Sequence, residues 1–194
     1  MRVTGPGQPA HLLVEIIELL NLLRVPSAVI GALAVSFYGV PRSTNDADAT
    51  IWLDGTGKTA DDLAKRFTGA GYRSNLRRGD MDDPVGGVLT VGDIHENRID
   101  LLLGIRGMDA DAVKRCVSTV LLDSPVRIIG AEDLIAMKIF AAGVRDIDDV
   151  QGVLRVSGKT LDLLLLRSLC GRYGIEATQK LESLLKELPP LQGS

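Results

Sequence analysis

The sequence predicts an α/β protein, in which a mixed β-sheet is flanked by helices and followed by a helical C-terminal part. Short apolar and β-branched runs alternate with amphipathic helical patterns in residues 1–130, which is typical of an α/β core. After Gly130 only helical patterns remain. The 194 residues, 45% hydrophobic and 24% charged, suffice for one globular domain with a small addition.

The N-terminal part opens with apolar residues at helical spacing over residues 12–23, and Pro26 ends this pattern. Runs rich in β-branched and aromatic residues indicate strands, and Asp54-Gly55 marks the end of one of them. We expect a sheet of four or five strands. The expected helices lie at residues 12–23, 32–38, 59–67 and 109–117, and the expected strands at Ser27–Ile30, 48–53, 88–91, 98–103 and 126–129.

The C-terminal part carries helical patterns at residues 132–142, 145–153, 161–173 and 176–188. We therefore divide the chain into an α/β core, residues 1–130, and a helical part packed on it, residues 131–194. A functional site is expected in the cleft between the two parts.

The bulk composition limits the classes of partner and compartment. A formal net charge of −3 gives no global attraction to nucleic acid, so any RNA contact requires a local basic patch. Arg73, Arg77 and Arg78 form such a group, although a solvated edge strand is the favoured interpretation. Two widely spaced cysteines, no signal-peptide pattern and no membrane-spanning stretch predict a cytoplasmic protein without a disulfide framework.

Two aspartates at the start of a strand suggest chemistry. Asp46 and Asp48 are two residues apart, so in a strand their side chains share one face at a spacing of roughly 6.5–7 Å. Neighbouring carboxylates repel each other, and a bound divalent cation relieves that repulsion. A solvated cap or turn is the alternative interpretation of this pair.

A third acid, Asp100, begins an almost wholly apolar run that reads as a second strand. An acid that enters a buried strand is usually paired or bound to metal. Three carboxylates on two adjacent strands would make a two-metal site for phosphoryl transfer.

The segments before these acids carry groups that can bind phosphate. Gly31 and Ala32 stand where an apolar strand meets a helix, and such a turn exposes backbone N–H groups. Arg42 offers a guanidinium that clamps phosphate oxygens, and Thr44 offers a hydroxyl. An ordinary strand–turn–helix and a surface salt bridge are the respective alternatives.

These segments, in this order, resemble the signature of the DNA polymerase β-like nucleotidyltransferase superfamily. That signature has an apolar residue, a glycine, a small residue, a spacer, and two acids separated by an apolar residue. Within the superfamily, residues 31–34 and 38–48 look like those of the AbiEii-type toxin nucleotidyltransferases, and so do residues 132–138 and 145–150. The resemblance covers residues 29–153. Ala32 departs from the family, which usually has Gly, Ser or Thr there, so a hydroxyl donor is lost.

The resemblance implies a nucleotidyltransferase-like fold and a bacterial enzyme that moves a nucleoside monophosphate from an NTP to a hydroxyl. Asp46 and Asp48 would bind Mg²⁺, and Asp100 would be the third metal ligand and the base. Lys138 would contact nucleotide or acceptor, and Asp146 or Asp149 would complete or brace the pocket. The nucleotide-binding set would be Gly31, Ala32, Arg42, Thr44 and Asp146.

Three interpretations of function stay open at this point. The first is a toxin of a toxin–antitoxin system that acts on tRNA or protein and has an antitoxin partner. The second is a small-molecule nucleotidyltransferase similar to the aminoglycoside-modifying members. The third is a nucleotidyltransferase-like module that binds without turnover. Lys138 could equally snorkel from an apolar helix, and the acids of residues 146–149 could simply favour a helix N-terminus.

Overall fold

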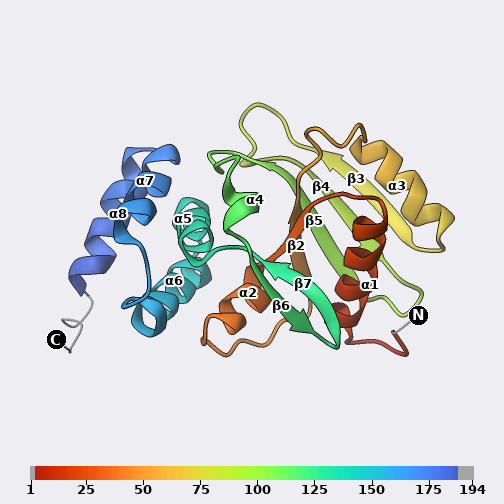
Figure 1. Cartoon of the computed structure of the whole chain (residues 1–194), viewed down its shortest axis with the longest axis horizontal. Coiled ribbons are helices and arrows are strands. Elements are labelled where there is room, and N and C mark those ends of the chain that lie inside the picture. Colours follow the sequence, from red (N-terminus) through yellow and green to blue (C-terminus); the bar gives the residue numbers. More distant parts are fainter. Residues whose placement is uncertain (1–2, 188–194) are drawn as a thin grey trace.

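One mixed sheet of seven strands organises the N-terminal part of the computed structural model, which describes residues 3–187. The strand order is β3-β4-β5-β2-β1-β7-β6 (Figure 1). β2 runs parallel to β5 and β1 runs parallel to β7, whereas the other neighbours are antiparallel. The strands are β1 Ser27–Ile30, β2 Ala47–Ile51, β3 Arg73–Arg78, β4 Val85–Gly92, β5 Arg98–Ile105, β6 Val117–Leu121 and β7 Ser124–Ile128.

Helices cover the sheet and then gather beside it. α1 contacts β2, β5 and β7, and α3 contacts β3 and β4. Helices α5 to α8 follow the last strand and lie at the opposite end of the molecule from α3 (Figure 1). The helices are α1 Pro9–Leu22, α2 Gly31–Phe37, α3 Ala60–Gly69, α4 Ala112–Arg115, α5 Ala131–Ala141, α6 Val144–Ser157, α7 Leu163–Arg172 and α8 Ile175–Glu187.

The alternation along β2 and β5 separates the core from the site. Ala47 and Ala49 on β2, with Ile99 and Leu101 on β5, are fully or almost fully buried in the core. Residues of the other parity point to the opposite face of the sheet. The pattern of apolar residues thus fixes the face on which the intervening aspartates emerge.

Two features of the sheet differ from the expectation of four or five strands. The strands number seven, because Arg73–Arg78 forms edge strand β3, as favoured from its charges, and Val117–Leu121 forms β6. The helix expected at residues 109–117 shrinks to α4, because Cys116 is extended and β-branched residues follow it. A two-residue turn at Leu122 and Asp123, both at positive φ, joins β6 to β7. Leucine is not a turn-forming residue, so this hairpin has no clear local signal in the sequence.

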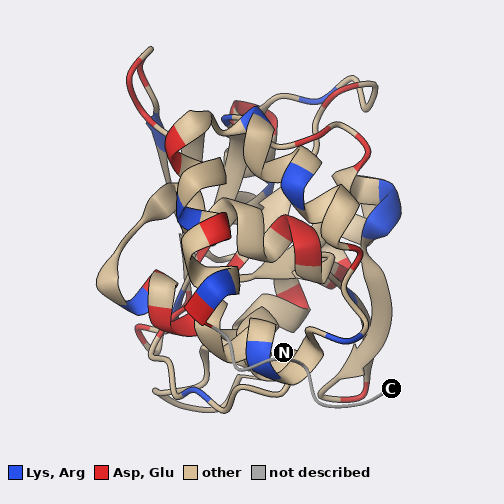
Figure 2. Cartoon of the chain, turned by 90° about the vertical axis from the view of Figure 1, so that its left-hand side faces the viewer, with Lys and Arg blue, Asp and Glu red and all other residues tan. Residues whose placement is uncertain are grey.

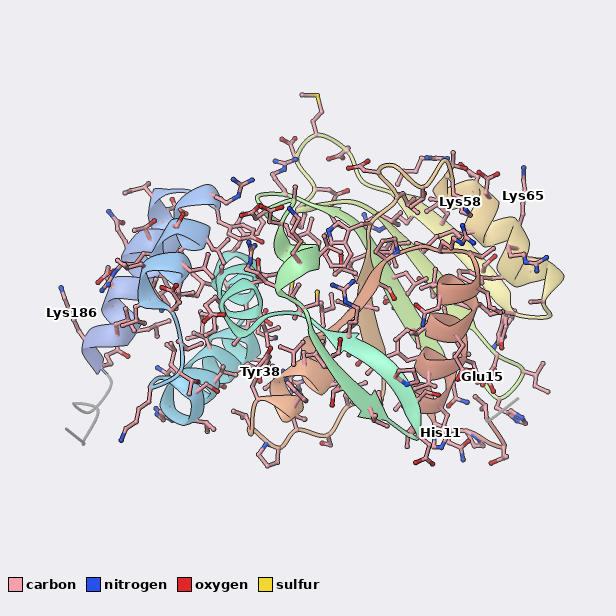
Figure 3. The ribbon with its side chains drawn as sticks, in the orientation of Figure 1. His11, Glu15, Tyr38, Lys58, Lys65 and Lys186 are labelled. Atoms are coloured by element: carbon pink, nitrogen blue, oxygen red, sulfur yellow. The ribbon has the colours of Figure 1, made fainter. Side chains whose placement is uncertain are left out.

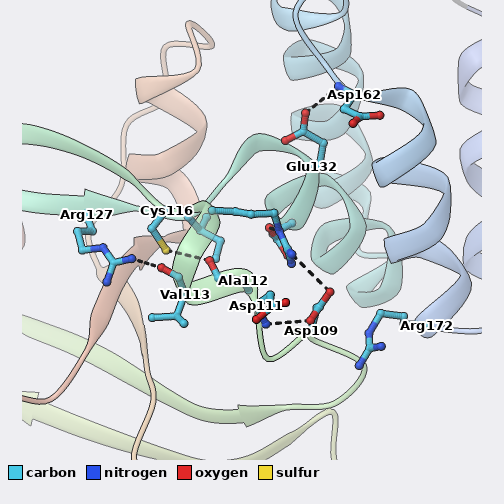
Figure 4. A network of polar contacts seen from close by, with 12 residues as sticks. Asp109, Asp111, Ala112, Val113, Cys116, Arg127, Glu132, Asp162 and Arg172 are labelled. Carbon is cyan, nitrogen blue, oxygen red and sulfur yellow. Dashed lines mark hydrogen bonds and ion pairs between the residues drawn. The ribbon is translucent and has the colours of Figure 1, made fainter.

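A buried ion pair holds the first helix of the C-terminal part against the segment that precedes β6. The Arg115 guanidinium donates to both carboxylate oxygens of Asp133, at 2.7 and 2.8 Å, and the Asp133 side chain is 3% exposed. Asp109 accepts a further, longer hydrogen bond from Arg115, at 3.4 Å, within the polar network of Figure 4. The division of the chain at residue 130 stays a prediction, and residues 188–194 lie outside the described part.

We expect Asp133→Asn to lower the free energy of unfolding by up to roughly 3 kcal/mol, because it removes the buried charge that holds Arg115 with two hydrogen bonds and leaves the guanidinium only the longer contact with Asp109, at 3.4 Å. Chemical denaturation monitored by circular dichroism measures this loss. The matched control is Glu182→Gln, which removes the charge from an exposed pair with Arg167 and is expected to have a much smaller effect. Equal losses in the two variants would contradict the structural weight given to the buried pair.

Candidate active site

A glycine places the start of α2 against the second aspartate. Gly31 has φ +63°, a left-handed conformation that favours glycine. A Cβ on Gly31 would lie 2.3 Å from Oδ2 of Asp48. Ile30, the preceding residue, is the register partner of Asp48 in the antiparallel β1–β2 pair. Glycine is therefore required here by both the backbone angle and the closeness of the carboxylate.

Two of the three predicted acids are direct neighbours across strands. Asp48 and Asp100 are register partners in the parallel β2–β5 pair, so their side chains emerge side by side on the same sheet face. Asp46 lies one residue before β2, and Thr44 Oγ1 lies 2.6 Å from Asp46 Oδ1. The structure thus brings the three acids together at the start of β2.

Both carboxylate oxygens of Asp100 have partners. Thr90, its register partner on β4, donates its hydroxyl to Oδ1 at 2.6 Å. Arg98 donates to Oδ2 at 2.7 Å, and its side chain is 61% exposed. Neither partner was singled out from sequence, although Arg98 is two residues from Asp100 and so shares its face. Thr90 required knowledge of the β4–β5 register.

Asp149 links the two cations predicted for the site. Its side chain is 7% exposed and accepts hydrogen bonds from Arg42 and from Lys138, the latter at 2.8 Å between Nζ and Oδ2. Lys138 also bonds to Asp146, at 2.7 Å. Arg42 therefore pairs with an acid of α6 and not with the adjacent acids of its own loop. This network ties the Arg42 loop to α5 and α6.

A cavity of about 780 Å³ opens in front of these groups. Its volume lies in the range of small-molecule and cofactor sites. The polar residues lining it include Arg145, whose place in the cavity was not predicted. The predicted site residues that line it are Gly31, Ala32, Arg42, Thr44, Asp46, Asp48, Lys138 and Asp146. Asp100 is not among the lining residues.

A second hollow, of about 360 Å³, meets the first at three residues. Arg42, Thr44 and Asp46 line both, and the second hollow continues along the start of α1 to His11 and Leu122. Figure 3 shows His11 on α1, on the side of the molecule away from α5. Two hollows that meet at one carboxylate can hold two reactants on either side of it.

The electrostatics of Asp48 reflect this crowding. Burial, together with the charges of Asp46 and Asp100, raises the pKa of Asp48 to about 6. Lys138 and Arg98 act in the opposite direction but do not cancel the effect. The ionised form of Asp48 is therefore costly unless a further positive charge arrives.

The donor set fits a hard divalent cation such as Mg²⁺. Asp46 and Asp48 present carboxylate oxygens, the ligand type that Mg²⁺ prefers. Among residues 3–187 no three His, Cys, Asp or Glu side chains are arranged as a ready-made metal cage. Mg²⁺ does not require one, because it is commonly held by one or two carboxylates together with substrate phosphates.

Other residues considered from sequence lie apart from the cavity. Arg73, Arg77 and Arg78 are on edge strand β3, where Arg77 pairs with Asp83 and Arg78 with Asp61. Acidic and basic residues are interspersed over the face presented by α7 and α8, so that face has no single sign of charge (Figure 2). None of the helices in the described part of the chain has the length and apolarity to cross a membrane.

Comparisons with known proteins identify the fold. No family model and no curated protein sequence matches the chain. Among solved structures, the chain is similar to the antibiotic-resistance factor ANT(2'')-Ia in solution, with 16% identity, coverage of 91% of this chain and 94% of that chain, and a TM-score of 0.59. It is also similar to crystalline ANT(2'')-Ia in complex with adenylyl-2''-tobramycin, with 18% identity, coverage of 85% and 98%, and a TM-score of 0.60.

A third similar structure is an antigenic nucleotidyltransferase-like protein from Paracoccidioides brasiliensis, with 19% identity, coverage of 95% of each chain and a TM-score of 0.50. The likenesses extend over nearly the whole of each chain, so they concern the sheet and the helical part together. At these identities they establish architecture. The chain has the nucleotidyltransferase-like α/β fold predicted from its sequence.

Proposed function

We propose that this chain is a Mg²⁺-dependent nucleotidyltransferase, which moves a nucleoside monophosphate from an NTP to a hydroxyl. The observation that carries the proposal is the pairing of Asp48 and Asp100 across β2 and β5, beside Gly31. The cavity at this place is lined by the cationic side chains of Arg42, Lys138 and Arg145. A purely structural role does not account for adjacent carboxylates at a place where burial, together with their mutual repulsion, raises the pKa of Asp48. A cation that binds the carboxylates and a nucleotide phosphate would account for the pairing of the acids and would relieve their repulsion.

In the proposed reaction the acceptor oxygen forms a bond to the α-phosphorus, and the bond to the β-phosphate oxygen breaks, which releases pyrophosphate. Asp100 accepts the acceptor's proton after Arg98, which is exposed, moves from Oδ2. Lys138 and Arg145 offset the charge that develops on the phosphates. Asp46 and Asp48 would hold Mg²⁺, and the bound ion would supply Lewis-acid polarisation of the α-phosphate. The backbone of Gly31 and Ala32 lines the cavity, where it would contact phosphate oxygens.

Two classes of acceptor are proposed, each supported by a different observation. The resemblance to AbiEii-type toxins supports a macromolecular acceptor, tRNA or protein, and an antitoxin partner in a bacterial cytoplasm. The likeness to a protein solved with adenylyl-2''-tobramycin supports a small hydroxylated molecule instead. The second hollow would hold either acceptor, because Asp46 lines it together with the cavity assigned to the nucleotide. A non-catalytic module is the remaining proposal, supported by Ala32.

A transfer assay tests the proposal. The protein is incubated with Mg²⁺, each of four α-labelled NTPs, and total RNA with lysate protein or a panel of aminoglycosides. We expect label on one acceptor class, and we expect Asp46→Asn, Asp48→Asn and Asp100→Asn to lower the rate by roughly 100- to 1000-fold or more, because each removes charge that acts on the transition state.

The matched control for this assay is Asp54→Asn, which neutralises an exposed carboxylate just beyond β2. Its rate should equal that of the unchanged chain. An Asp48→Asn protein with full activity would refute the site assignment. No label on RNA or protein would favour the small-molecule enzyme if Mg²⁺–NTP still binds, and the non-catalytic module if it does not.

The raised pKa of Asp48 makes a prediction for the metal-free protein. Folding raises the pKa of Asp48, so the folded chain binds this proton more tightly than the unfolded chain does. Between about pH 4 and pH 6 the free energy of unfolding should therefore fall as pH increases, and it should not recover at higher pH. Asp48→Asn removes this loss. In EDTA at pH 8 we expect the variant to be more stable than the unchanged chain by roughly 1–3 kcal/mol.

Urea denaturation at pH 4, 6 and 8 measures this difference. The gain from Asp48→Asn should shrink towards zero at pH 4, because this pH is close to the ordinary pKa of 3.8 and little of the pH-dependent loss has yet occurred. A variant that is less stable than the unchanged chain at pH 8 would show that Asp48 is held by favourable contacts and is not under repulsion.

A further inference from the structure

The large cavity has two chemically different ends along β5. Asp46 and Asp48 line it near Asp100, whereas Leu102 and Ile105 line it further along β5, with Val85 opposite Ile105 on β4. Leu102 lies two residues beyond Asp100 on the same face, which is roughly 6.6 Å along the strand. The apolar end is lined by Pro84, Val85, Leu102, Ile105, Met137 and Phe140.

Phe140 is the aromatic residue among the described residues that line this cavity. It lies on α5 two residues after Lys138, so the ring and the ammonium group come from one rigid element. The ring of Tyr173 lies behind it, with a centroid distance of 5.0 Å and an interplanar angle of 32°. Because Tyr173 covers one side of a half-buried ring, Phe140 meets the cavity with the remainder.

Tyr173 is itself held in place from the other side. A Cβ on Gly107, which has φ +81°, would lie 2.7 Å from Cδ1 of the Tyr173 ring, so the ring packs directly on this glycine. The neighbouring Arg172 donates from Nε to the carbonyl of Gly107 at 3.0 Å. The segment after β5 therefore supports Tyr173, and Tyr173 supports Phe140.

The other side of the same stack is fixed by polar contacts between α5 and α7. Glu132 of α5 accepts a hydrogen bond from the backbone N–H of Asp162, the N-cap of α7, at 2.9 Å (Figure 4). α5 and α7 thus cannot slide apart without loss of this bond. A ring backed by a second ring on two tied helices keeps its orientation before any ligand arrives, which lowers the entropic cost of binding a planar group.

We infer that Phe140, backed by Tyr173, is the platform on which the nucleobase of the donor nucleotide stacks. This inference rests on the proposed function and adds to it the place and the mode of base binding. The phosphates lie at the charged end, between Lys138 and Asp48, and the base lies at the apolar end of the same cavity. The acceptor has the second hollow on the other side of Asp46.

The walls of the apolar end bear on specificity. The six apolar side chains offer surface for stacking and packing and carry no hydrogen-bonding groups of their own. Stacking tolerates any base, because every base has a π-face, and larger rings gain more from it. Purine nucleotides should therefore bind more tightly than pyrimidine nucleotides, by a modest factor, in place of strict selection of one base.

The test compares ligands with and without a base. Isothermal titration calorimetry with Mg²⁺ measures the Kd of ATP, CTP and inorganic tripolyphosphate for the unchanged chain, Phe140→Leu and Phe140→Tyr. We expect Phe140→Leu to weaken ATP binding by roughly 5- to 100-fold and CTP binding by less, and to leave tripolyphosphate binding unchanged. Phe140→Tyr should retain ATP affinity, because its ring keeps the stacking surface.

Phe37→Leu is the matched control, because Phe37 is 42% exposed at the end of α2 and does not line the cavity. It should change no Kd. Tyr173→Leu removes the backing ring and should weaken ATP binding but not tripolyphosphate binding. Thermal melting confirms that each variant is folded at the temperature of titration.

The remaining outcomes separate this inference from the proposed function. If the unchanged chain binds ATP and Phe140→Leu binds it equally well, the platform is refuted while the proposed function stands. Equal weakening of ATP and tripolyphosphate would also refute it, because the effect would then lie at the phosphate end. An unchanged Kd for ATP with a raised KM for the acceptor would move the acceptor onto Phe140. If the unchanged chain binds neither ligand, both proposals fail.

Discussion

Two carboxylates in register on adjacent parallel strands are the constraint on which the rest of the structure depends. Asp48 and Asp100 stand side by side because β2 and β5 run in the same direction with these residues opposite each other. Like charges at this spacing oppose folding, so the sheet must be held by other means. The alanines, isoleucine and leucine of opposite parity on the same two strands are buried under α1, and their burial offsets the repulsion.

Counter-charges then surround the acids without neutralising them. Arg98 takes one oxygen of Asp100, while Lys138 and Arg42 are held by Asp149 at the side of the cavity. The cations are therefore near Asp48 but committed elsewhere, and the pKa of Asp48 stays raised, at about 6. The side chains of Lys138 and Arg42 therefore lie beside the cavity before a ligand arrives. An incoming phosphate that binds near Lys138 would meet positive charge that is already in place. In a core built only for stability, we would expect Asp48 to pair directly with Lys138 or Arg42.

The sequence predicted the elements that have one dominant local signal. The Ser27–Ile30 strand and the helices after Gly130 were predicted because apolar periodicity and glycine or proline boundaries agree. It failed at β6, where leucine and aspartate in left-handed turn positions carry no local sign of a hairpin. The partners of Asp100 and the place of Phe140 also escaped, because both depend on the strand register and on helix packing between segments distant in the chain.

The position of α5 relative to the sheet decides whether the site is complete. Asp133 in its first turn is clamped by Arg115, which comes from the segment before β6, and Glu132 holds the start of α7. Later on the same helix, Lys138 and Phe140 face the cavity. A rigid helix rises about 1.5 Å per residue, so a clamp at one end sets the height of both side chains above β5. The buried ion pair therefore acts on the geometry of the site as well as on stability, since a helix freed at Asp133 would carry the cation and the aromatic ring away from the acids together.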